Sequence, residues 1–288
     1  MMLTFINVAT GGLLTGCVYG LMALGLSVIF GVIRIVNFAH GDMMVAGMYV
    51  VLLTNQVFGI DPLAATPIVA AGMFLVGYGL QRGIINRYIV RPEHEQFLLL
   101  LAISIILSSS MLMAFGPDAR NVQIDYAYDS YAFHGVLLDK VRLLAAAGAL
   151  GGAAVLWMLF RFTRLGKSIR ACADNPSGAY VVGLNVKRLY AVTFGIGAAC
   201  VGSAGTLMLL LVDVQPYIAS DYTLLAFVIV IIGGLGSMPG ALLGGVLVGV
   251  SEALSGFLIM PSLKSLFSFG LLILVLLARP QGLLGRPA

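Results

Sequence analysis

The sequence predicts an all-α polytopic membrane protein with about 8–9 transmembrane segments, some of them discontinuous. Only 10% of the 288 residues are charged and 60% are hydrophobic, whereas an average soluble domain is about a quarter charged. The mean hydropathy is +1.04. Residues 1–33 contain no charge, and a helix needs roughly 20 apolar residues to cross the hydrocarbon core. Lipid admits only helices or closed barrels, and the sequence lacks the alternating strands of about ten residues that barrels need.

Nine apolar segments follow one another along the chain, and we predict a helix for each. They span residues 5–31, 41–58, 63–84, 97–116, 142–160, 189–212, 222–233, 241–259 and 263–278. The stretches between them are too short to fold as a separate soluble domain. The sequence therefore predicts a single integral membrane domain over residues 1–288, in which residues 161–188 form a basic loop.

The distribution of Lys and Arg predicts how the chain is oriented, because short cytoplasmic loops carry an excess of these residues. An outer N-terminus and a cytoplasmic C-terminus place twelve of the 16 Lys and Arg residues inside. These are Arg34, Arg82, Arg87, Arg91, Arg161, Arg164, Lys167, Arg170, Lys187, Arg188, Arg279 and Arg286. The same orientation makes residues 117–141 an outer loop that is rich in Asp and Tyr.

Several of the 36 glycines recur four residues apart, on one face of a predicted helix. Small residues at this spacing let two helix backbones approach closely in lipid. We therefore expect tight packing at these positions, either within the bundle or against a partner subunit. The glycines concerned are Gly12, Gly16 and Gly20 in the first segment, and the pairs Gly240–Gly244 and Gly245–Gly249 in a later one.

The stretch VNFAHGDMMVAG interrupts the apolar pattern after the first segment. Asn37, His40, Gly41 and Asp42 occur here within six residues. Polar groups inside a bilayer are costly, and transporters build substrate sites from interrupted helices. One interpretation is therefore a broken helix that lines a substrate pathway, with Gly41 relaxing the backbone. The other is an ordinary cytoplasmic turn in which Asp42 caps the second helix.

A second interruption lies in the uncharged residues 222–251, which are too many for one untilted span. Its centre reads GGLGSMPG, and glycine and proline at this density do not sustain a helix. One break in each half of a transporter points to a central pathway, so we assign to it Gly233, Gly234, Gly236, Ser237 and Gly240.

Glu252 is an acidic residue in the apolar segment that follows the second interruption. An ionised group at this depth is costly unless it has a function or a partner. We assign it to the pathway or to a contact with a partner subunit. The alternative is a position near the outer interface.

The basic loop 161–188 predicts two short helices. Residues 167–174 suit the first, and Asn175 caps a second that has Pro176 at its first position and Gly183 beyond its end. Two short helices can enter a groove of a partner. The docking surface is assigned to Arg164, Gly166, Lys167, Arg170, Ala171, Asn175, Pro176 and Gly183. Composition alone favours a second interpretation, a basic loop that contacts lipid headgroups.

The sequence carries no enzyme motif. The tripeptide GKS at 166–168 resembles the end of a phosphate-binding loop, but that motif needs a glycine where this chain has Arg161. His40, His94 and His134 lie in three different connections, and no zinc or nucleophile motif occurs. We therefore expect no catalytic site, no metal and no bound ATP in this chain.

Three stretches resemble one family of transport proteins. YGLMALGLSVIFGVIRIVNFAHGD at 19–42 resembles the start of the branched-chain amino acid ABC-transporter permeases of the LivH type. LGKSIRACADNP at 165–176 and GGLGSMPGA at 233–241 are similar to further stretches of that family. They occur in the expected order and together span most of the chain, from residue 19 to residue 241. Many members have Glu in place of Asp42.

The resemblance implies a permease subunit of a bacterial importer in the cytoplasmic membrane, which moves leucine, isoleucine and valine. It also implies a second permease subunit, two cytoplasmic ATPase subunits that hold ATP and Mg²⁺, and an extracytoplasmic binding protein that meets the acidic outer loops. The segment from Gly166 to Pro176 would then couple the permease to an ATPase. Membrane lipid surrounds such a protein, and nucleic acid is not a partner.

Two alternatives stay open at this point. One is a permease of the same family for urea, short amides or other amino acids. The other is a stand-alone channel or secondary transporter, which needs no ATPase.

Overall fold

The computed structural model describes residues 2–127, 129–133, 136–260 and 264–285. The helices are α1 (Met2–Ile33), α2 (His40–Phe58), α3 (Pro62–Gly83), α4 (Glu93–Phe115), α5 (Lys140–Phe162), α6 (Arg164–Asp174), α7 (Pro176–Val181), α8 (Val186–Leu209), α9 (Ile218–Gly233), α10 (Met238–Leu258) and α11 (Lys264–Ala278). A 3₁₀ turn, Ile85–Arg87, follows α3. Each predicted apolar segment coincides with one of these helices, and the ends differ by four residues or fewer.

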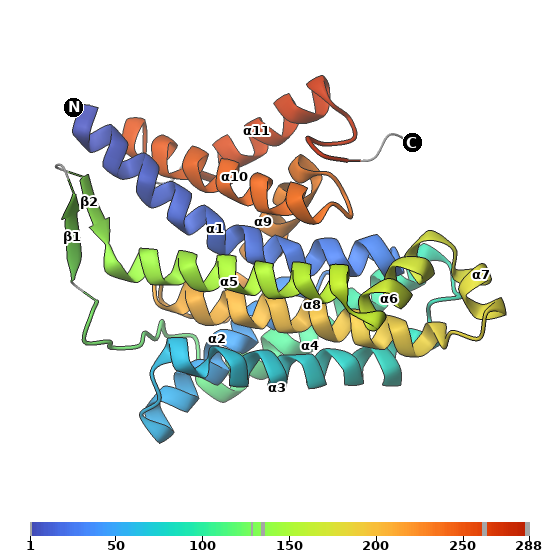
Figure 1. The fold of residues 1–288 in the computed structure, drawn as a ribbon. Helices are drawn as coiled ribbons and strands as arrows, with labels where there is room; N and C mark the ends of the chain where they lie inside the picture. Colours follow the sequence, from blue (N-terminus) through green and yellow to red (C-terminus); the bar gives the residue numbers. More distant parts are fainter. Residues whose placement is uncertain (1, 128, 134–135, 261–263, 286–288) are drawn as a thin grey trace.

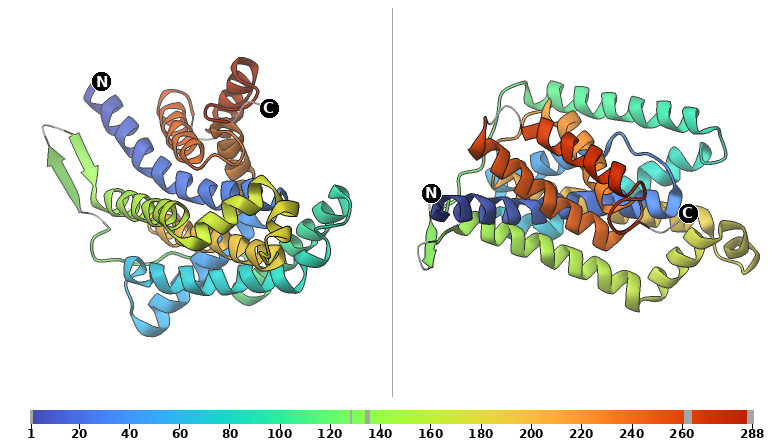
Figure 2. Two further views of the ribbon diagram at one scale, coloured as in Figure 1. Left: turned by 45° about the vertical axis from the view of Figure 1, so that its right-hand side comes forward. Right: turned by 90° about the horizontal axis from the view of Figure 1, so that it is seen from above.

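The long helices lie side by side along one direction (Figure 1). α1 packs against α10 on one side and against α5 and α8 on the other. α3 packs on α8, and α9 contacts both α2 and α10. The N-terminus lies at one end of the bundle, and α6, α7 and the C-terminal segment lie toward the other (Figures 1 and 2).

The two ends of the bundle differ in charge. The end with the N-terminus, here called the acidic end, has the α2–α3, α4–α5 and α8–α9 connections (Figure 1). These connections and the first turn of α9 contain Asp61, Asp118, Asp125, Asp129, Asp139, Asp213 and Asp221. The opposite end, here called the basic end, carries eleven of the twelve Lys and Arg residues that the sequence places inside. The twelfth, Arg286, lies outside the described residues. The charges thus divide as the predicted orientation requires, and which end faces the cytoplasm stays a prediction.

Six helices among the described residues are long and apolar enough to cross a membrane: α1, α3 with its 3₁₀ turn, α4, α5, α8 and α10. α9 and α11, with 16 and 15 residues, are apolar but short for a full span. The chain is therefore a largely helical, multi-pass membrane protein. The predicted total of about 8–9 spans stays a prediction.

α1 and α8 form the core of the bundle. Met22 and Ile29 of α1 and Phe194 of α8 are almost completely buried. By contrast, α4 and α11 expose apolar side chains, for example Ile106 and Leu277. Such surfaces suit contact with lipid tails, which are as apolar as leucine.

Glycines let α1 and α10 approach closely. A Cβ on Gly16 would lie 2.7 Å from Val246 Cα, and a Cβ on Gly245 would lie 2.5 Å from Gly20 Cα. Any larger residue at these positions would force the two backbones apart. The expected close packing is therefore confirmed, and at these positions it occurs within the bundle.

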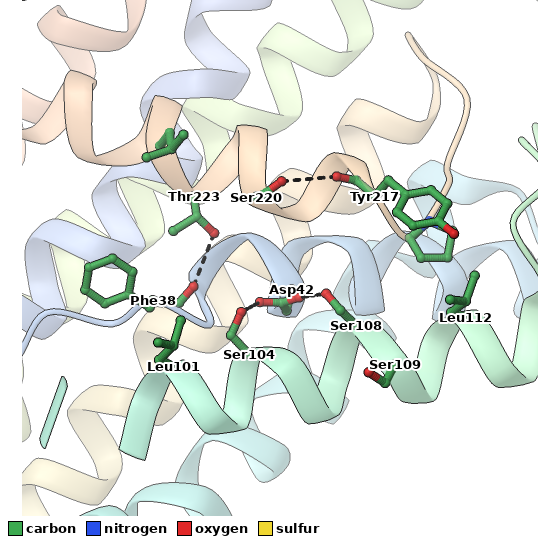
Figure 3. Close-up of a pocket in the computed structure, with 12 residues that line it drawn as sticks. Phe38, Asp42, Leu101, Ser104, Ser108, Ser109, Leu112, Tyr217, Ser220 and Thr223 are labelled. Carbon is green, nitrogen blue, oxygen red and sulfur yellow. Dashed lines mark hydrogen bonds between the residues drawn. The ribbon is translucent and has the colours of Figure 1, made fainter. Parts of the chain in front are cut away.

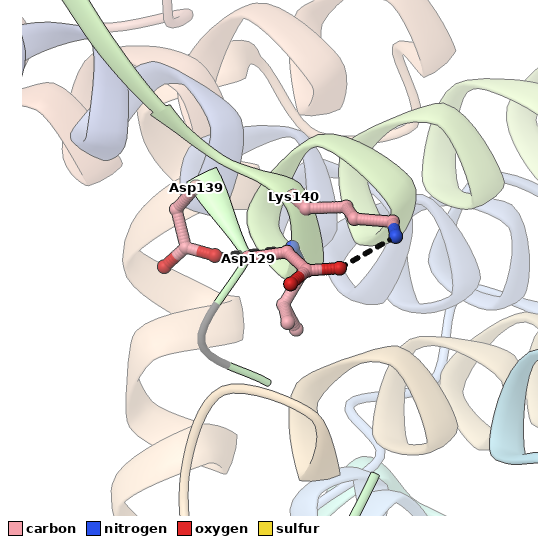
Figure 4. A network of polar contacts seen from close by, with 4 residues as sticks. Asp129, Asp139 and Lys140 are labelled. Carbon is pink, nitrogen blue, oxygen red and sulfur yellow. Dashed lines mark hydrogen bonds and ion pairs between the residues drawn. The ribbon is translucent and has the colours of Figure 1, made fainter. Parts of the chain in front are cut away.

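The loop between α4 and α5 contains a β-hairpin, β1 (Ser130–Phe133) and β2 (Val136–Asp139), that the sequence did not predict. The strands pair antiparallel, with Ser130 opposite Asp139. At their base Lys140 Nζ lies 2.7 Å from Asp129 Oδ2 (Figure 4). Strands of four residues are too short to show a clear alternating pattern, so hydropathy does not reveal them. His134 lies outside the described residues.

Candidate functional site

α2 begins inside the bundle instead of at its basic end. α1 runs to Ile33 at the basic end, and residues 34–39 then turn back alongside it. His40, the first residue of α2, places its Nε2 3.0 Å from the carbonyl oxygen of Met22. Met22 lies eleven residues before Ile33, which is roughly 16 Å along a helix that rises 1.5 Å per residue. The first break is therefore a re-entrant segment.

The polar residues of this segment hold it in place. The Asn37 side-chain oxygen accepts a hydrogen bond from the Ala39 amide (3.1 Å), which forms a turn that Asn favours. The His40 Nε2 donates to Met22, since a carbonyl oxygen only accepts. The His40 Nδ1 has no hydrogen-bond partner among the described residues. Because Asn37 and His40 are fully buried, both help to fix where α2 begins.

Asp42 does not cap α2, which corrects the second interpretation of this stretch. The N-cap position is Ala39, which makes no side-chain hydrogen bond to the helix, and Asp42 lies in the first turn. The Asp42 carboxylate accepts hydrogen bonds from the hydroxyls of Ser104 and Ser108, one turn apart on α4 (Figure 3). The carboxylate therefore joins the start of α2 to the middle of α4.

The start of α2 also contacts α9. The Gly41 amide donates a hydrogen bond of 2.9 Å to the Thr223 hydroxyl. That hydroxyl lies 3.0 Å from the carbonyl oxygen of Ala219 and 3.3 Å from that of Phe38 (Figure 3). A Cβ on Gly41 would overlap the Ala219 oxygen, so only glycine lets the helix start so close to α9.

A cavity of about 440 Å³ opens between α2, α4 and α9 (Figure 3). It is lined by Phe38, Asp42, Leu101, Ser104, Ser108, Ser109, Leu112, Pro216, Tyr217, Ser220, Thr223 and Leu224. The lining combines the Asp42 carboxylate with hydroxyl groups and apolar side chains. Such a site can hold a cationic group beside the carboxylate and an apolar group against the leucines.

The hydroxyl groups of this cavity were not assigned from the sequence. The available signal was a set of serines, Ser104 and residues 108–110, in an otherwise apolar segment. Thr223 gave no such signal, because a threonine can satisfy its hydroxyl within its own helix. Its hydroxyl does reach the Ala219 carbonyl one turn back, so the role of Thr223 depends on the neighbouring start of α2.

The second predicted break is confirmed as an interruption of the helix. α9 ends at Gly233, and Ser237 caps α10 by accepting a hydrogen bond from the Gly240 amide (3.2 Å). Gly234 and Gly236 between them have φ angles of 103° and 78°, in the region that favours glycine. The glycines are therefore needed for the shape of the connection.

This second break lies at the basic end, beside the end of α1. A Cβ on Gly31 would lie 3.1 Å from Gly236 Cα. The Leu283 amide donates to the Ile232 carbonyl (2.8 Å), so the C-terminal segment completes the end of α9. Residues of the second break line a second cavity, and none of them lines the first. Within the described part of the chain, the two breaks do not share one cavity.

Glu252 on α10 occupies a third place. Its carboxylate accepts hydrogen bonds from the Tyr19 hydroxyl on α1 (3.1 Å) and from the Ser268 hydroxyl on α11 (3.0 Å). The residues assigned to the pathway therefore lie at three separate places, of which only the start of α2 contributes to the first cavity. Their role in transport stays a prediction.

The basic loop folds as two short helices, α6 and α7. α6 begins three residues earlier than predicted, because Thr163 caps it by accepting a hydrogen bond from the Gly166 amide (3.0 Å). Asn175 caps α7 through the Gly178 amide (2.8 Å), and Pro176 takes the first helical position. The predicted caps at Asn175 and Pro176 are therefore confirmed.

The surface of this loop is basic with an apolar tip. Seven of the eight residues assigned to docking are exposed, and Gly166 is buried against the backbone of Phe160. At the tip Tyr180, Val181 and Val182 are each at least 76% exposed. Exposed apolar groups that cluster in this way are typical of a protein interface.

A helix that begins inside a bundle, beside a cavity with a carboxylate and hydroxyl groups in an otherwise apolar lining, is typical of transporters. The parts of the chain that the structure describes contain no group of three or more His, Cys, Asp or Glu side chains that could hold a metal ion. The fold and the cavity thus define a multi-pass membrane protein with the features of a transporter. The family described as "Branched-chain amino acid transport system / permease component" matches residues 8–276, and the chain belongs to this family.

Three relatives are similar over most of the chain, and all are named as permease proteins of a high-affinity branched-chain amino acid transport system. LivH of Escherichia coli (strain K12) is 34% identical over 303 residues, which cover 99% of this chain and 97% of the relative. BraD of Pseudomonas aeruginosa is 30% identical, covering 98% and 96%. LivM of Escherichia coli (strain K12) is 27% identical, covering 93% and 68%. The resemblance found in the sequence is confirmed.

Proposed function

We propose that this chain is a permease subunit of an ABC importer that carries branched-chain amino acids across the bacterial cytoplasmic membrane. The observation that carries the proposal is the cavity at the start of α2 with Asp42 in its wall. The similarity to LivH and BraD over nearly the whole chain supports it. Partner subunits hydrolyse the ATP, and the permease supplies the pathway.

The cavity matches the chemistry of this substrate, which is a zwitterion with an apolar side chain. The ammonium group binds at the Asp42 carboxylate, whose oxygens have lone pairs beyond those that Ser104 and Ser108 use. The apolar side chain lies against Leu101, three residues before Ser104 on α4. The start of α2 is the positive end of a helix dipole and favours the substrate carboxylate.

The proposed assembly contains a second permease, two ATPases and an extracytoplasmic binding protein. LivH and LivM occur in one organism under the same description of a transport system, which supports a sister permease as the second subunit. The tip formed by Tyr180, Val181 and Val182 anchors an ATPase subunit, and the exposed Arg164 and Lys167 on α6 add positive charge to the same loop. The acidic end then faces the binding protein.

Uptake of radiolabelled leucine tests the proposal. The chain is expressed with its partner subunits in cells that lack their own branched-chain amino acid uptake. Asp42→Asn keeps the size of the side chain and removes its charge, so we expect uptake to fall about tenfold or more while the complex still assembles. Ser110→Ala is the control, because Ser110 is an exposed residue of α4 that does not line the cavity, and its hydroxyl donates to the Ile106 carbonyl.

Competition separates the alternatives. Unlabelled leucine, isoleucine and valine should each suppress uptake of the label. Uptake of labelled urea or of a short amide by the same complex, with no uptake of labelled leucine, would assign the chain to another substrate of the same family. Leucine uptake that persists without the ATPase subunits would show a stand-alone transporter and would contradict the proposal.

A further inference from the structure

A second cavity, of about 970 Å³, lies at the basic end between α1, α5, α6, the α9–α10 connection and the C-terminal segment. Arg34, Arg161 and Arg170 line it, together with apolar side chains such as Trp157 and Ile231. We propose that this cavity binds an anionic phospholipid, whose phosphate contacts the arginines and whose acyl chain lies along the apolar wall. The proposal is independent of which substrate the protein transports.

The charge of the lining favours an anion. Asp174 also lines the cavity, so three arginines and one aspartate give a net charge of +2. Two ion pairs occur among the described residues, Lys140 with Asp129 and Arg142 with Asp139, and both lie at the acidic end. The three arginines therefore make no ion pair in the described part of the chain. Guanidinium groups bind phosphate oxygens through paired hydrogen bonds.

The position of the cavity favours a lipid over a soluble anion. α1 is uncharged up to Ile33, and Arg34 follows directly, while Arg161 lies in the last turn of α5. The Arg161 guanidinium lies 5.3 Å from the ring centre of Trp157, which is 51% exposed. Tryptophan beside basic residues is typical of the membrane interface, where cavities of this kind bind anionic headgroups. The apolar wall, which includes Leu235, can contact the acyl chain of a lipid, whereas a soluble anion has no apolar part to place there.

Arg34 has a backbone conformation that glycine adopts more readily. Its φ is 60°, and every other residue with a positive φ in the described ranges is a glycine. The Arg34 amide donates to the Phe30 carbonyl (3.0 Å) at the end of α1, where glycine is the usual residue. An arginine at this position has a strained backbone, and its guanidinium lies in the cavity wall. Arg34→Gly therefore removes the charge without adding strain.

Trp157 makes the proposal testable, because it is the single tryptophan of the chain and lines the cavity. The protein is purified with its bound subunits and reconstituted into nanodiscs that contain brominated phosphatidylglycerol or brominated phosphatidylcholine. Brominated chains quench tryptophan on contact. The same measurement on Trp157→Phe gives the signal of the other subunits, which is subtracted.

We expect brominated phosphatidylglycerol to quench Trp157 in preference to brominated phosphatidylcholine, by about fivefold or more in relative association. Arg34→Gly and Arg161→Gln should each lower this preference about three- to fivefold, since each removes one basic contact. Arg188→Gln is the matched control, because Arg188 is exposed at the same end and does not line the cavity. It should leave the preference unchanged.

Three outcomes would overturn the proposal. The first is equal quenching by the two lipids, or a preference that survives both arginine substitutions. The second is loss of the preference in millimolar inorganic phosphate at constant ionic strength, which would assign the arginines to a soluble anion. The third is a preference seen for the isolated chain and absent in the complex, which would show that a partner subunit fills the cavity.

Discussion

The Tyr19 hydroxyl donates a hydrogen bond of 3.1 Å to Glu252, although 233 residues separate the two in the chain. Ser268 donates to the other carboxylate oxygen at 3.0 Å. Glu252 thus joins α1, α10 and α11, and a hydroxyl occupies each of its oxygens. We interpret this carboxylate as a link that holds the three helices together. This structural role explains why an acidic residue occurs in an apolar segment, and it does not require Glu252 to line the substrate pathway.

Glu252→Ala should destabilise the protein, because it leaves the hydroxyl of Tyr19 without its partner. An unpaired buried group costs about 1–3 kcal/mol, which corresponds to a fall of roughly 3–10 °C in the thermal midpoint. Tyr19→Phe should have a smaller effect, since Ser268 still serves the carboxylate. A thiol-reactive dye can follow unfolding in detergent, because Cys17 and Cys200 are buried. An unchanged midpoint with lost uptake would instead make Glu252 a transport residue.

Replacing both Ser104 and Ser108 by alanine should raise the KM for leucine uptake and leave the maximal rate nearly unchanged. The two hydroxyls orient the Asp42 carboxylate, and each hydrogen bond to a charged group contributes about 1.5–3 kcal/mol. We expect a KM at least about tenfold higher. A KM that falls would show that the serines compete with the substrate for Asp42.

Gly236→Ala should destabilise the connection between α9 and α10. The φ of Gly236 is 78°, a region that costs an alanine about 1–2 kcal/mol. Gly79→Ala is the matched control, because Gly79 lies within α3 with open space around it. A helical alanine there should be neutral or stabilising by up to about 1 kcal/mol. The thermal midpoint of Gly236→Ala should therefore fall, whereas that of Gly79→Ala should stay the same or rise. Equal midpoints for the two variants would contradict this prediction.

Val181→Asp should uncouple ATP hydrolysis from transport, because it places a charge at the apolar tip of the loop. Val181 is 83% exposed, so the substitution should leave the fold intact. The measurement is ATP hydrolysis stimulated by substrate-loaded binding protein in the reconstituted complex. Gly83→Asp introduces the same charge at the exposed end of α3, outside this loop, and should retain stimulation. Full stimulation in Val181→Asp would remove the tip from the ATPase contact.

The helices could be predicted from the sequence because a helix in lipid requires a long run of apolar, uncharged residues, and such runs are easy to recognise. A run without charges marks each long helix, and the caps of α7 follow from the local chemistry of Asn175 and Pro176. The hairpin gave no comparable signal, since its strands have four residues each. The loop was predicted as basic helices, but α6 began earlier because Thr163 caps it.

The candidate site could be predicted only in part. Asn37, His40, Gly41 and Asp42 stood out as polar groups or glycine in an apolar context, and the structure gives Gly41 and Asp42 specific contacts. The depth at which α2 begins could not be inferred, because it depends on packing against α9, far away in the sequence. For the same reason the sequence could not show that the two breaks line different cavities.

The start of α2 also sets an order of events during synthesis. Gly41 and Thr223, which hold it against α9, are 182 residues apart. A ribosome adds about 5–20 residues per second, so roughly 10–40 s pass between the two. During that time the re-entrant segment sits in the membrane with an incomplete set of partners. The first half of the nascent chain therefore cannot complete its packing until the second half has emerged. Until then it is exposed to membrane proteases.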